Sequence, residues 1–292
     1  MSLEDFIKER NHKLSPNSIK TYASLLRSLH RKIFDGDFDL SHFNNSKKVI
    51  DHVQPLPYTK RKTLLSALIM LTDNDEYRNL LHQDFKSEKS TIMKHEKTKS
   101  QEDNWVSESD IFAKLKLLKK YADLSYKMDS PNVQIIQDYV LLCLMSGLYI
   151  SPRRSMDWTE FKIKNIKDKD NYLEKNKLVF NRYKTDKHYG TQIIDCPKEL
   201  LTILKKWISL NDNEYLLFDG NGKKLTSSKI TNRFNKIFFP KKVSTNILRH
   251  VYLTNKFGDQ IAKQLEIEQT FKNMGSSGQQ LDTYVKINPK TT

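Results

Sequence analysis

Residues 146–158 read Ser-Gly-Leu-Tyr-Ile-Ser-Pro-Arg-Arg-Ser-Met-Asp-Trp, so two adjacent arginines, Arg153 and Arg154, directly follow a proline. Proline is favoured in the first turn of a helix because its φ angle is already helical and its missing amide hydrogen would have no partner there. The stretch therefore predicts a helix that begins with two guanidinium groups. An arginine pair by itself is most often a solvated helix face, so its meaning depends on the rest of the chain.

Three further patterns follow along the sequence, and each is weak alone. Lys184 falls in a predicted β-hairpin, where a lysine usually keeps a strand edge soluble. Residues 246–250 read Asn-Ile-Leu-Arg-His and open a predicted helix, and residues 274–278 read Met-Gly-Ser-Ser-Gly. Tyr284 follows them near the C-terminal end, where a tyrosine is usually a packing residue. The order of the four patterns is far more specific than any one of them.

In this order, the patterns resemble the tyrosine recombinase family, whose catalytic domain contains an arginine, a hairpin lysine, His-x-x-Arg-His, Gly-His and a nucleophilic tyrosine. The resemblance covers residues 105–287, whereas the N-terminal half is similar only in kind, as a helical core-binding domain. Pro-Arg-Arg-x-x-Asp-Trp, together with residues 96–105, is most similar to integrases of large DNA viruses, virophages and related mobile elements. The resemblance implies site-specific DNA recombination, including integration of a viral or mobile genome.

The resemblance also implies a chemical role for each matching residue. Tyr284 would be the nucleophile and form a 3′-phosphotyrosyl intermediate. Arg249 and one arginine of the pair would hold the non-bridging phosphate oxygens, since a guanidinium binds them in bidentate fashion and stays protonated. Lys184 would protonate the departing 5′ oxygen as a general acid, and His250 would support the phosphate. The covalent intermediate keeps the bond energy, so no metal ion, ATP or other cofactor is expected.

The spacing leaves open which arginine of the pair contacts the phosphate. Arg154 is preferred because Arg154 and Asp157 repeat the family's Arg-x-x-acid spacing. Arg153 is the alternative register. An alignment without gaps instead places Tyr149 at the family arginine, so the preferred register requires inserted residues.

Two histidines of the family pattern are replaced in this chain. Asn246 stands three residues before Arg249, and Ser276 stands where Gly-His is usual. Asn and Ser donate hydrogen bonds to a phosphate but do not accept a proton near neutral pH. Two alternatives follow: proton transfer runs through Lys184 and water, with Asn246 and Ser276 supporting the phosphate, or the enzyme is weak or degenerate.

The composition indicates a polyanionic partner. The 292 residues include 50 Lys and Arg against 35 Asp and Glu, a net charge of +15. This surplus is spread along the chain, which favours a basic groove built from folded elements over a disordered arm. We expect the partner to be double-stranded DNA, and a surface charged only for solubility is the plain alternative.

Cysteine content and hydropathy indicate the cellular setting. Cys143 and Cys196 are the only cysteines, so the sequence predicts neither a disulfide framework nor a zinc cluster. The longest apolar run, residues 140–145, is too short to span a membrane. We expect a soluble intracellular protein without a membrane partner, located wherever its target DNA is, in a host nucleus or at a viral replication site.

The sequence predicts two domains and a mainly α fold with a small antiparallel β-sheet. Residues 1–88 read as a helical DNA core-binding domain, residues 89–104 as a basic linker and residues 105–292 as the catalytic domain. The β-prone runs that form the sheet lie within residues 160–196.

A row of basic residues marks one helix of the N-terminal domain. Lys60, Arg61 and Lys62 lie in the first turn of a helix that Thr59 is expected to cap. Cations at a helix N-terminus oppose the helix dipole, so we expect these side chains to bind the DNA backbone, with solvated charge as the alternative. Ser15, directly before a proline, is the predicted N-cap of another helix.

Four classes of function fit these observations to different degrees. A recombinase would act as a homotetramer on DNA and be a monomer or weak oligomer when free. A type IB topoisomerase would use the same chemistry as a monomer to relax supercoils. A degenerate relative would bind DNA without cutting it, and a basic RNA-binding or structural protein is supported by the net charge alone. The helical N-terminal half and the motif wording favour the recombinase.

Overall fold

The computed structural model describes residues 2–277 and 281–285, which divide into two compact units, Met1–Glu96 and Lys97–Thr292. The division falls inside the linker predicted over residues 89–104. That stretch is largely helical, because helix α5 continues to Ile92 and a further helix, α6, begins at Lys99.

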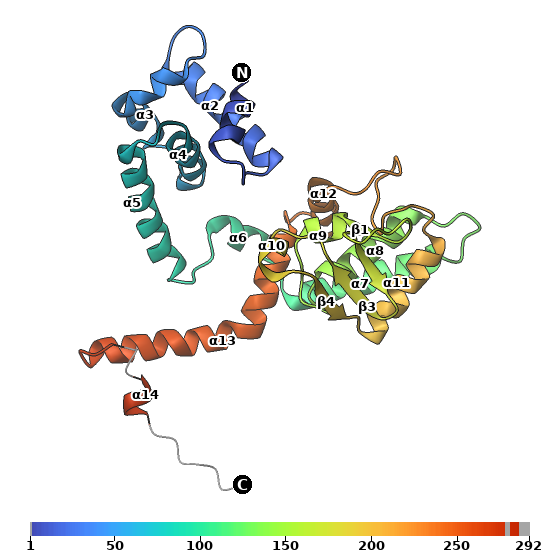
Figure 1. Ribbon diagram of the computed structural model, residues 1–292. Helices are drawn as coiled ribbons and strands as arrows, with labels where there is room; N and C mark the ends of the chain where they lie inside the picture. Colours follow the sequence, from blue (N-terminus) through green and yellow to red (C-terminus); the bar gives the residue numbers. More distant parts are fainter. Residues whose placement is uncertain (1, 278–280, 286–292) are drawn as a thin grey trace. The chain divides into compact units, whose positions relative to one another are not determined.

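The first unit is entirely helical among its described residues (Figure 1). Ser15 caps its second helix as predicted, since the Ser15 hydroxyl accepts a hydrogen bond from the Ser18 amide at 3.1 Å. The helices close over a single apolar core around Ile7, Leu26 and Leu65. Its elements are α1 (Leu3–Arg10), α2 (Pro16–Ile33), the 3-10 helix η1 (Leu40–Asn44), α3 (Ser46–Val53), α4 (Tyr58–Thr72) and α5 (Asp75–Ile92).

Helix α4 differs from the prediction in its cap and in the role of one basic residue. Pro57 occupies the N-cap position without a side-chain hydrogen bond, so Thr59 is not the cap. The Arg61 side chain is only 17% exposed and forms a bidentate pair with Asp84 of α5, whose side chain is 7% exposed. Arg61 also donates to the Leu56 carbonyl at 2.8 Å. Arg61 is therefore a tie between α4, α5 and the preceding turn, contrary to the predicted DNA contact.

Lys60 and Lys62, on either side of Arg61, form fewer contacts within the protein. Lys60 is exposed. The Lys62 ammonium lies 3.6 Å from the Glu88 carboxylate and 5.0 Å from the Phe85 ring centroid. Both remain available to a partner at the surface of α4.

We predict that Arg61→Ala destabilises the first unit alone, by about 2 to 4 kcal/mol, because Asp84 would remain buried without its partner. All three tryptophans, Trp105, Trp158 and Trp207, belong to the second unit. In urea denaturation, the circular dichroism transition should therefore shift while the tryptophan fluorescence transition does not.

Arg78→Ala is the matched control for this substitution. The Arg78 side chain is 43% exposed and pairs with the exposed Asp73 and Asp75, so its loss should cost less than about 1 kcal/mol. Equal shifts for both variants would show that the Arg61 pair is no stronger than a surface pair.

The second unit packs helices around a small sheet and contains most of the apolar core. Helix α8 is buried along nearly its whole length and contacts α7 and α11. Trp158, Phe161 and Phe180 form an aromatic cluster with centroid distances of 5.2 to 5.7 Å. Its helices are α6 (Lys99–Asn104), α7 (Glu108–Ser125), α8 (Val133–Met145), α9 (Ser155–Thr159), α10 (Asp186–Tyr189), α11 (Lys198–Leu210), α12 (Ser227–Ile237), α13 (Thr245–Asn273) and α14 (Leu281–Tyr284).

The sheet has the order β1-β2-β3-β4 and is mixed rather than antiparallel as predicted. Strands β2–β3 and β3–β4 are antiparallel, whereas β1 and β2 are parallel. Strand β2 was not predicted, because its sequence is polar. Its first residue, Asn171, is fully buried and binds the backbone of Asp157, Asn181 and Arg182. The strands are β1 (Phe161–Lys162), β2 (Asn171–Glu174), β3 (Lys177–Phe180) and β4 (Gln192–Asp195).

The structure confirms the predicted fold class, a mainly helical chain of two units with one small sheet. Cys143 and Cys196 are free thiols in the core, and burial raises the pKa of Cys143 to about 12 and that of Cys196 to about 11. Across the described residues, no helix is both long and apolar enough to cross a bilayer.

Candidate active site

Arg153 lies inside the second unit, just before α9, which begins at Ser155 after Arg154 at the N-cap rather than with the two arginines as predicted. Its side chain is 12% exposed, and its Nε donates to the Asp157 carboxylate, which is 4% exposed, at 2.9 Å. Its Nη1 donates to the Gln192 side chain at 2.7 Å. The guanidinium also stacks 3.9 Å from the Phe180 ring centroid and 5.1 Å from that of Tyr183. Arg153 thus connects α9 to both ends of the segment that joins β3 to β4.

That segment contains Lys184 and is longer than the predicted hairpin turn. It runs from residue 181 to 191 and includes the short helix α10. Tyr183 is buried and its hydroxyl donates to the Gly190 carbonyl at 2.6 Å, which closes the loop. Lys184, the next residue, is exposed. The Lys184 backbone is therefore anchored while its side chain is free to meet a partner.

Asp157 lies among three arginines. Burial raises the pKa of its carboxyl, and the charge and hydrogen bond of Arg153 oppose that rise. Arg154 and Arg249 also lie close enough for their charges to lower the pKa of Asp157. The Asp157 Oδ1 atom is buried and has no hydrogen-bond partner among the described residues. Arg153 thus binds the Asp157 carboxylate directly, whereas Arg154 and Arg249 act on it through their charges alone.

Arg249 comes from the N-terminal part of α13, which Ser244 caps and which packs through Leu248 and Val251. Its half-buried side chain lines a pocket of about 310 Å³ beside Ser151. Within the described residues, neither Arg154 nor Arg249 forms a side-chain hydrogen bond or ion pair, in contrast to Arg153. Two guanidinium groups are thus uncommitted next to the buried one. Asn246 and His250 lie exposed on the same part of α13.

Tyr284 lies apart from Arg153, Arg154 and Arg249. It lies in α14, is 57% exposed, and its ring centroid is 6.0 Å from that of Phe271. Ser276 is at the same place, since its amide donates to the Phe271 carbonyl at 2.9 Å. Phe271 is 22 residues beyond Arg249 in α13, which corresponds to a length on the order of 30 Å along the path of the helix. Helix α13 bends strongly along this path (Figure 1). The predicted site therefore forms two groups, at opposite ends of one helix.

Three residues that the sequence did not single out belong to the arginine group: Gln192 and Tyr183, which hold Arg153, and Tyr252. Tyr252 lines the same pocket as Arg249 and is hydrogen-bonded to Ser151 at 2.9 Å between the oxygens. The one local signal was the Tyr252–Lys256 spacing of four residues, which places an aromatic and a cation on one helix face.

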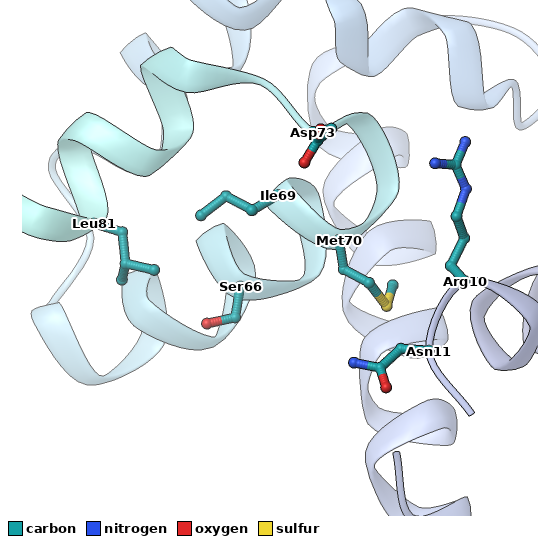
Figure 2. Close-up of a pocket in the computed structure, with 7 residues that line it drawn as sticks. All are labelled: Arg10, Asn11, Ser66, Ile69, Met70, Asp73 and Leu81. Atoms are coloured by element: carbon teal, nitrogen blue, oxygen red, sulfur yellow. The ribbon is translucent and has the colours of Figure 1, made fainter. Parts of the chain in front are cut away.

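A second hollow, of about 520 Å³, lies in the first unit and contains none of the predicted catalytic residues. Figure 2 shows its lining side chains. Asp73 among them already pairs with Arg78. The lining is polar with a few apolar groups, and it presents no clustered cations: Arg10, Asn11, Ser66, Ile69, Met70, Asp73 and Leu81. Nothing in it matches the chemistry of phosphodiester cleavage.

No protein-family model matches this sequence, and no curated protein is similar to it in sequence. Solved structures that are similar in fold include the following three. The XerH site-specific recombinase bound to palindromic difH substrate, in a post-cleavage complex, shares 15% identity over 99% of this chain and 81% of that chain, with a TM-score of 0.47. The Tn1549 transposon integrase with circular intermediate DNA shares 14% identity over 88% and 86%, with a TM-score of 0.46. XerA recombinase shares 15% over 88% and 84%, with a TM-score of 0.35.

We predict that substitutions of Arg153 and of Arg154 have different effects on the stability of the second unit. Arg153→Ala should destabilise the second unit by about 3 to 5 kcal/mol, because it leaves the Asp157 carboxylate buried and unpaired. Arg154→Ala should cost less than about 0.5 kcal/mol, as expected for a side chain without internal partners. Urea denaturation followed by tryptophan fluorescence measures both. A large loss for Arg154→Ala would show that Arg154, too, is a structural residue.

Proposed function

We propose that this chain is a tyrosine-type site-specific DNA recombinase or integrase, which cuts and rejoins DNA strands through a 3′-phosphotyrosyl intermediate. The observation that carries the proposal is the buried Arg153, which pairs with Asp157 and ties the Lys184 loop to it, together with the uncommitted Arg154 and Arg249. The order of these residues in the sequence, which resembles the family, supports it independently. The net charge of +15 suits a DNA partner.

Each group has a distinct part in the proposed reaction. Arg154 and Arg249 hold the non-bridging oxygens of the scissile phosphate, because their guanidinium groups are uncommitted. Arg153 is a positioning residue that holds Asp157 and the Lys184 loop. The positive charge of the two free arginines stabilises the charge that builds on the phosphate in the transition state.

The proposed cleavage step needs no cofactor, because each bond that forms is matched by a bond that breaks. The Tyr284 oxygen attacks phosphorus and loses its proton to solvent, a bond to phosphorus forms, and the bond from phosphorus to the 5′ oxygen breaks. Lys184 gives its proton to that departing oxygen. Rejoining is the reverse, with the 5′ hydroxyl as nucleophile. His250, Asn246 and Ser276 would contribute hydrogen bonds to the phosphate.

The position of Tyr284 bears on how the active site is completed. Phe271, whose ring lies beside that of Tyr284, follows Arg249 by a length on the order of 30 Å along the path of α13. Tyr284 therefore reaches the phosphate either after the far part of α13 moves or in a neighbouring copy. Both routes make completion of the site depend on assembly with DNA. We propose a homotetramer on double-stranded DNA, with Lys60 and Lys62 as backbone contacts in the first unit. An origin in a virus or related mobile element, with a role in integration of its genome, is part of the same proposal.

A second candidate is a DNA-binding protein that has lost catalysis. It is favoured by the replacement of the two family histidines by Asn246 and Ser276 and by the separation of Tyr284 from the arginines. It retains the basic surface and the uncommitted arginines but predicts no covalent product.

We predict that the protein forms a denaturation-resistant adduct with a nicked suicide duplex drawn from a random-sequence pool, and that Tyr284→Phe abolishes it. The nicked strand traps the intermediate because the 5′ fragment diffuses away before rejoining. An adduct with both proteins would place the nucleophile elsewhere. DNA binding without any adduct would support the non-catalytic candidate, and efficient relaxation of supercoiled plasmid at low protein concentration would indicate a topoisomerase.

Mixing Tyr284→Phe with Arg249→Ala identifies the subunit that supplies the tyrosine. An adduct from the mixture requires the Tyr284 of one chain to act at the Arg249 of another. If neither the mixture nor the separate variants form an adduct, the tyrosine acts within its own chain.

We predict that Lys184→Ala slows cleavage about 100-fold while duplex affinity changes less than twofold, because a general acid acts only in the transition state. A substrate with sulfur at the bridging 5′ position should restore the rate, since a thiolate leaves without a proton. Lys187→Ala, an exposed lysine of the same loop, is the matched control. Equal losses in binding and cleavage would show that Lys184 only contacts a phosphate and is not the general acid.

A further inference from the structure

Tyr252 is held from three sides next to Arg249, and the proposed reaction makes no use of it. Its hydroxyl oxygen is 2.9 Å from the Ser151 hydroxyl oxygen and accepts a hydrogen bond from the Lys256 ammonium at 3.3 Å. Ser151 lies just before the two arginines, so this contact joins the arginine segment to α13. The Tyr252 hydroxyl is therefore placed between a cationic helix face and the arginine group.

The Tyr252 ring is seated on the backbone of Gly147. Gly147 has a φ of +89°, and a Cβ there would lie 2.6 Å from the Tyr252 Cδ2 atom. Glycine is thus required at this position both for its backbone conformation and for the space that the ring occupies. A ring fixed in this way keeps its hydroxyl in one place without the entropy cost of ordering a free side chain.

The pocket around this hydroxyl combines four hydrogen-bond donors with three apolar side chains. Arg249, Lys256, Tyr252 and Ser151 supply charged and neutral donors, and no carboxylate is among its lining residues: Ser151, Pro152, Arg249, Tyr252, Leu253, Lys256 and Phe257. The acid Glu108 instead lines the adjoining pocket on the other face of Tyr252, where it accepts from Asn255 at 3.2 Å. The hydrogen bond to Ser151, assisted by Lys256, lowers the pKa of Tyr252, which agrees with a locally positive field.

We infer that Ser151, Tyr252 and Lys256 form, beside Arg249, a binding site for a DNA backbone phosphate other than the one that is cleaved. Lys256 is seven residues beyond Arg249 on α13, about 10 Å along the helix. One DNA strand carries a phosphate about every 3.4 Å of helix axis, so the two cations meet different phosphates of the same backbone. The exposed Phe257 and Leu253 flank the pocket with an apolar surface that suits deoxyribose.

This inference rests on the proposed function, because the ligand is duplex DNA. The experiment below distinguishes failure of this phosphate site from failure of the proposed function. Affinity for a fluorescent random-sequence duplex is measured between 50 and 200 mM salt, with all proteins in a Tyr284→Phe background so that no covalent product forms. Lys256→Gln should reduce the slope of log affinity against log salt by about 0.9, the contribution of one phosphate contact. Tyr252→Phe should weaken binding about three- to tenfold with little change in slope, because it removes a neutral donor.

Lys263→Gln is the matched control, since Lys263 is an exposed lysine of the same helix outside the pocket. It should change neither the slope nor the affinity as much as Lys256→Gln does. If Tyr252→Phe alters the thermal unfolding of the second unit, Ser151→Ala removes the hydroxyl partner without touching the ring and should weaken binding to a similar extent.

The outcomes are distinct. Binding by the parent protein with Lys256→Gln indistinguishable from Lys263→Gln would overturn this site and leave the recombinase proposal standing. Absence of duplex binding by the parent protein would overturn the recombinase proposal itself. A reduced slope for Lys256→Gln together with weaker binding by Tyr252→Phe supports the phosphate site whether or not an adduct forms with the Tyr284-containing protein.

Discussion

The buried guanidinium of Arg153 links the segments of the second unit that contain its uncommitted cations. It pairs with Asp157 of the helix α9 that follows it, binds Gln192 at the start of β4, and stacks on Phe180 of β3. A charge in the interior is tolerated only when it is paired and hydrogen-bonded, and these partners come from α9 and from both strands that flank the Lys184 loop. The positions of that loop and of the arginine segment are therefore coupled through one side chain.

Neighbouring arginines therefore have different roles. Arg153 stabilises the protein and is unavailable to a ligand. Arg154 follows it in sequence yet has no internal partner among the described residues, and Arg249 approaches the same carboxylate from α13. Two uncommitted cations beside a paired one suit the proposed binding of a phosphate, because side chains without partners lose no existing interaction when they bind it.

Helix α13 separates the two halves of the proposed chemistry. Its first turns pack in the core and present Arg249 and Tyr252, whereas its later turns expose apolar side chains such as Ile261 and Leu265. Tyr284 follows the far end. In the proposed reaction, this arrangement would keep Tyr284 away from the arginines until the chain has met its partners, so that DNA would not be cut before the complex is assembled.

The amino-acid sequence by itself determined the features that depend on a few adjacent residues. The N-cap at Ser15 and the mainly helical class follow from capping and periodicity, both of which act over short stretches. The sequence also singled out Arg249, the arginine pair and Asp157, and of these the structure pairs Arg153 with Asp157 at 2.9 Å.

Only the tertiary structure decided how each of those side chains is used. Arg61 and Arg153 look as exposed in the sequence as Lys60 and Arg154, but their partners lie 23 residues away at Asp84 and 39 residues away at Gln192. Strand β2 was missed because the buried Asn171 is satisfied by backbone groups that meet only in the fold. Whether a charge is free or committed is set by such long-range contacts, since the desolvation that decides it exists only once the chain is packed.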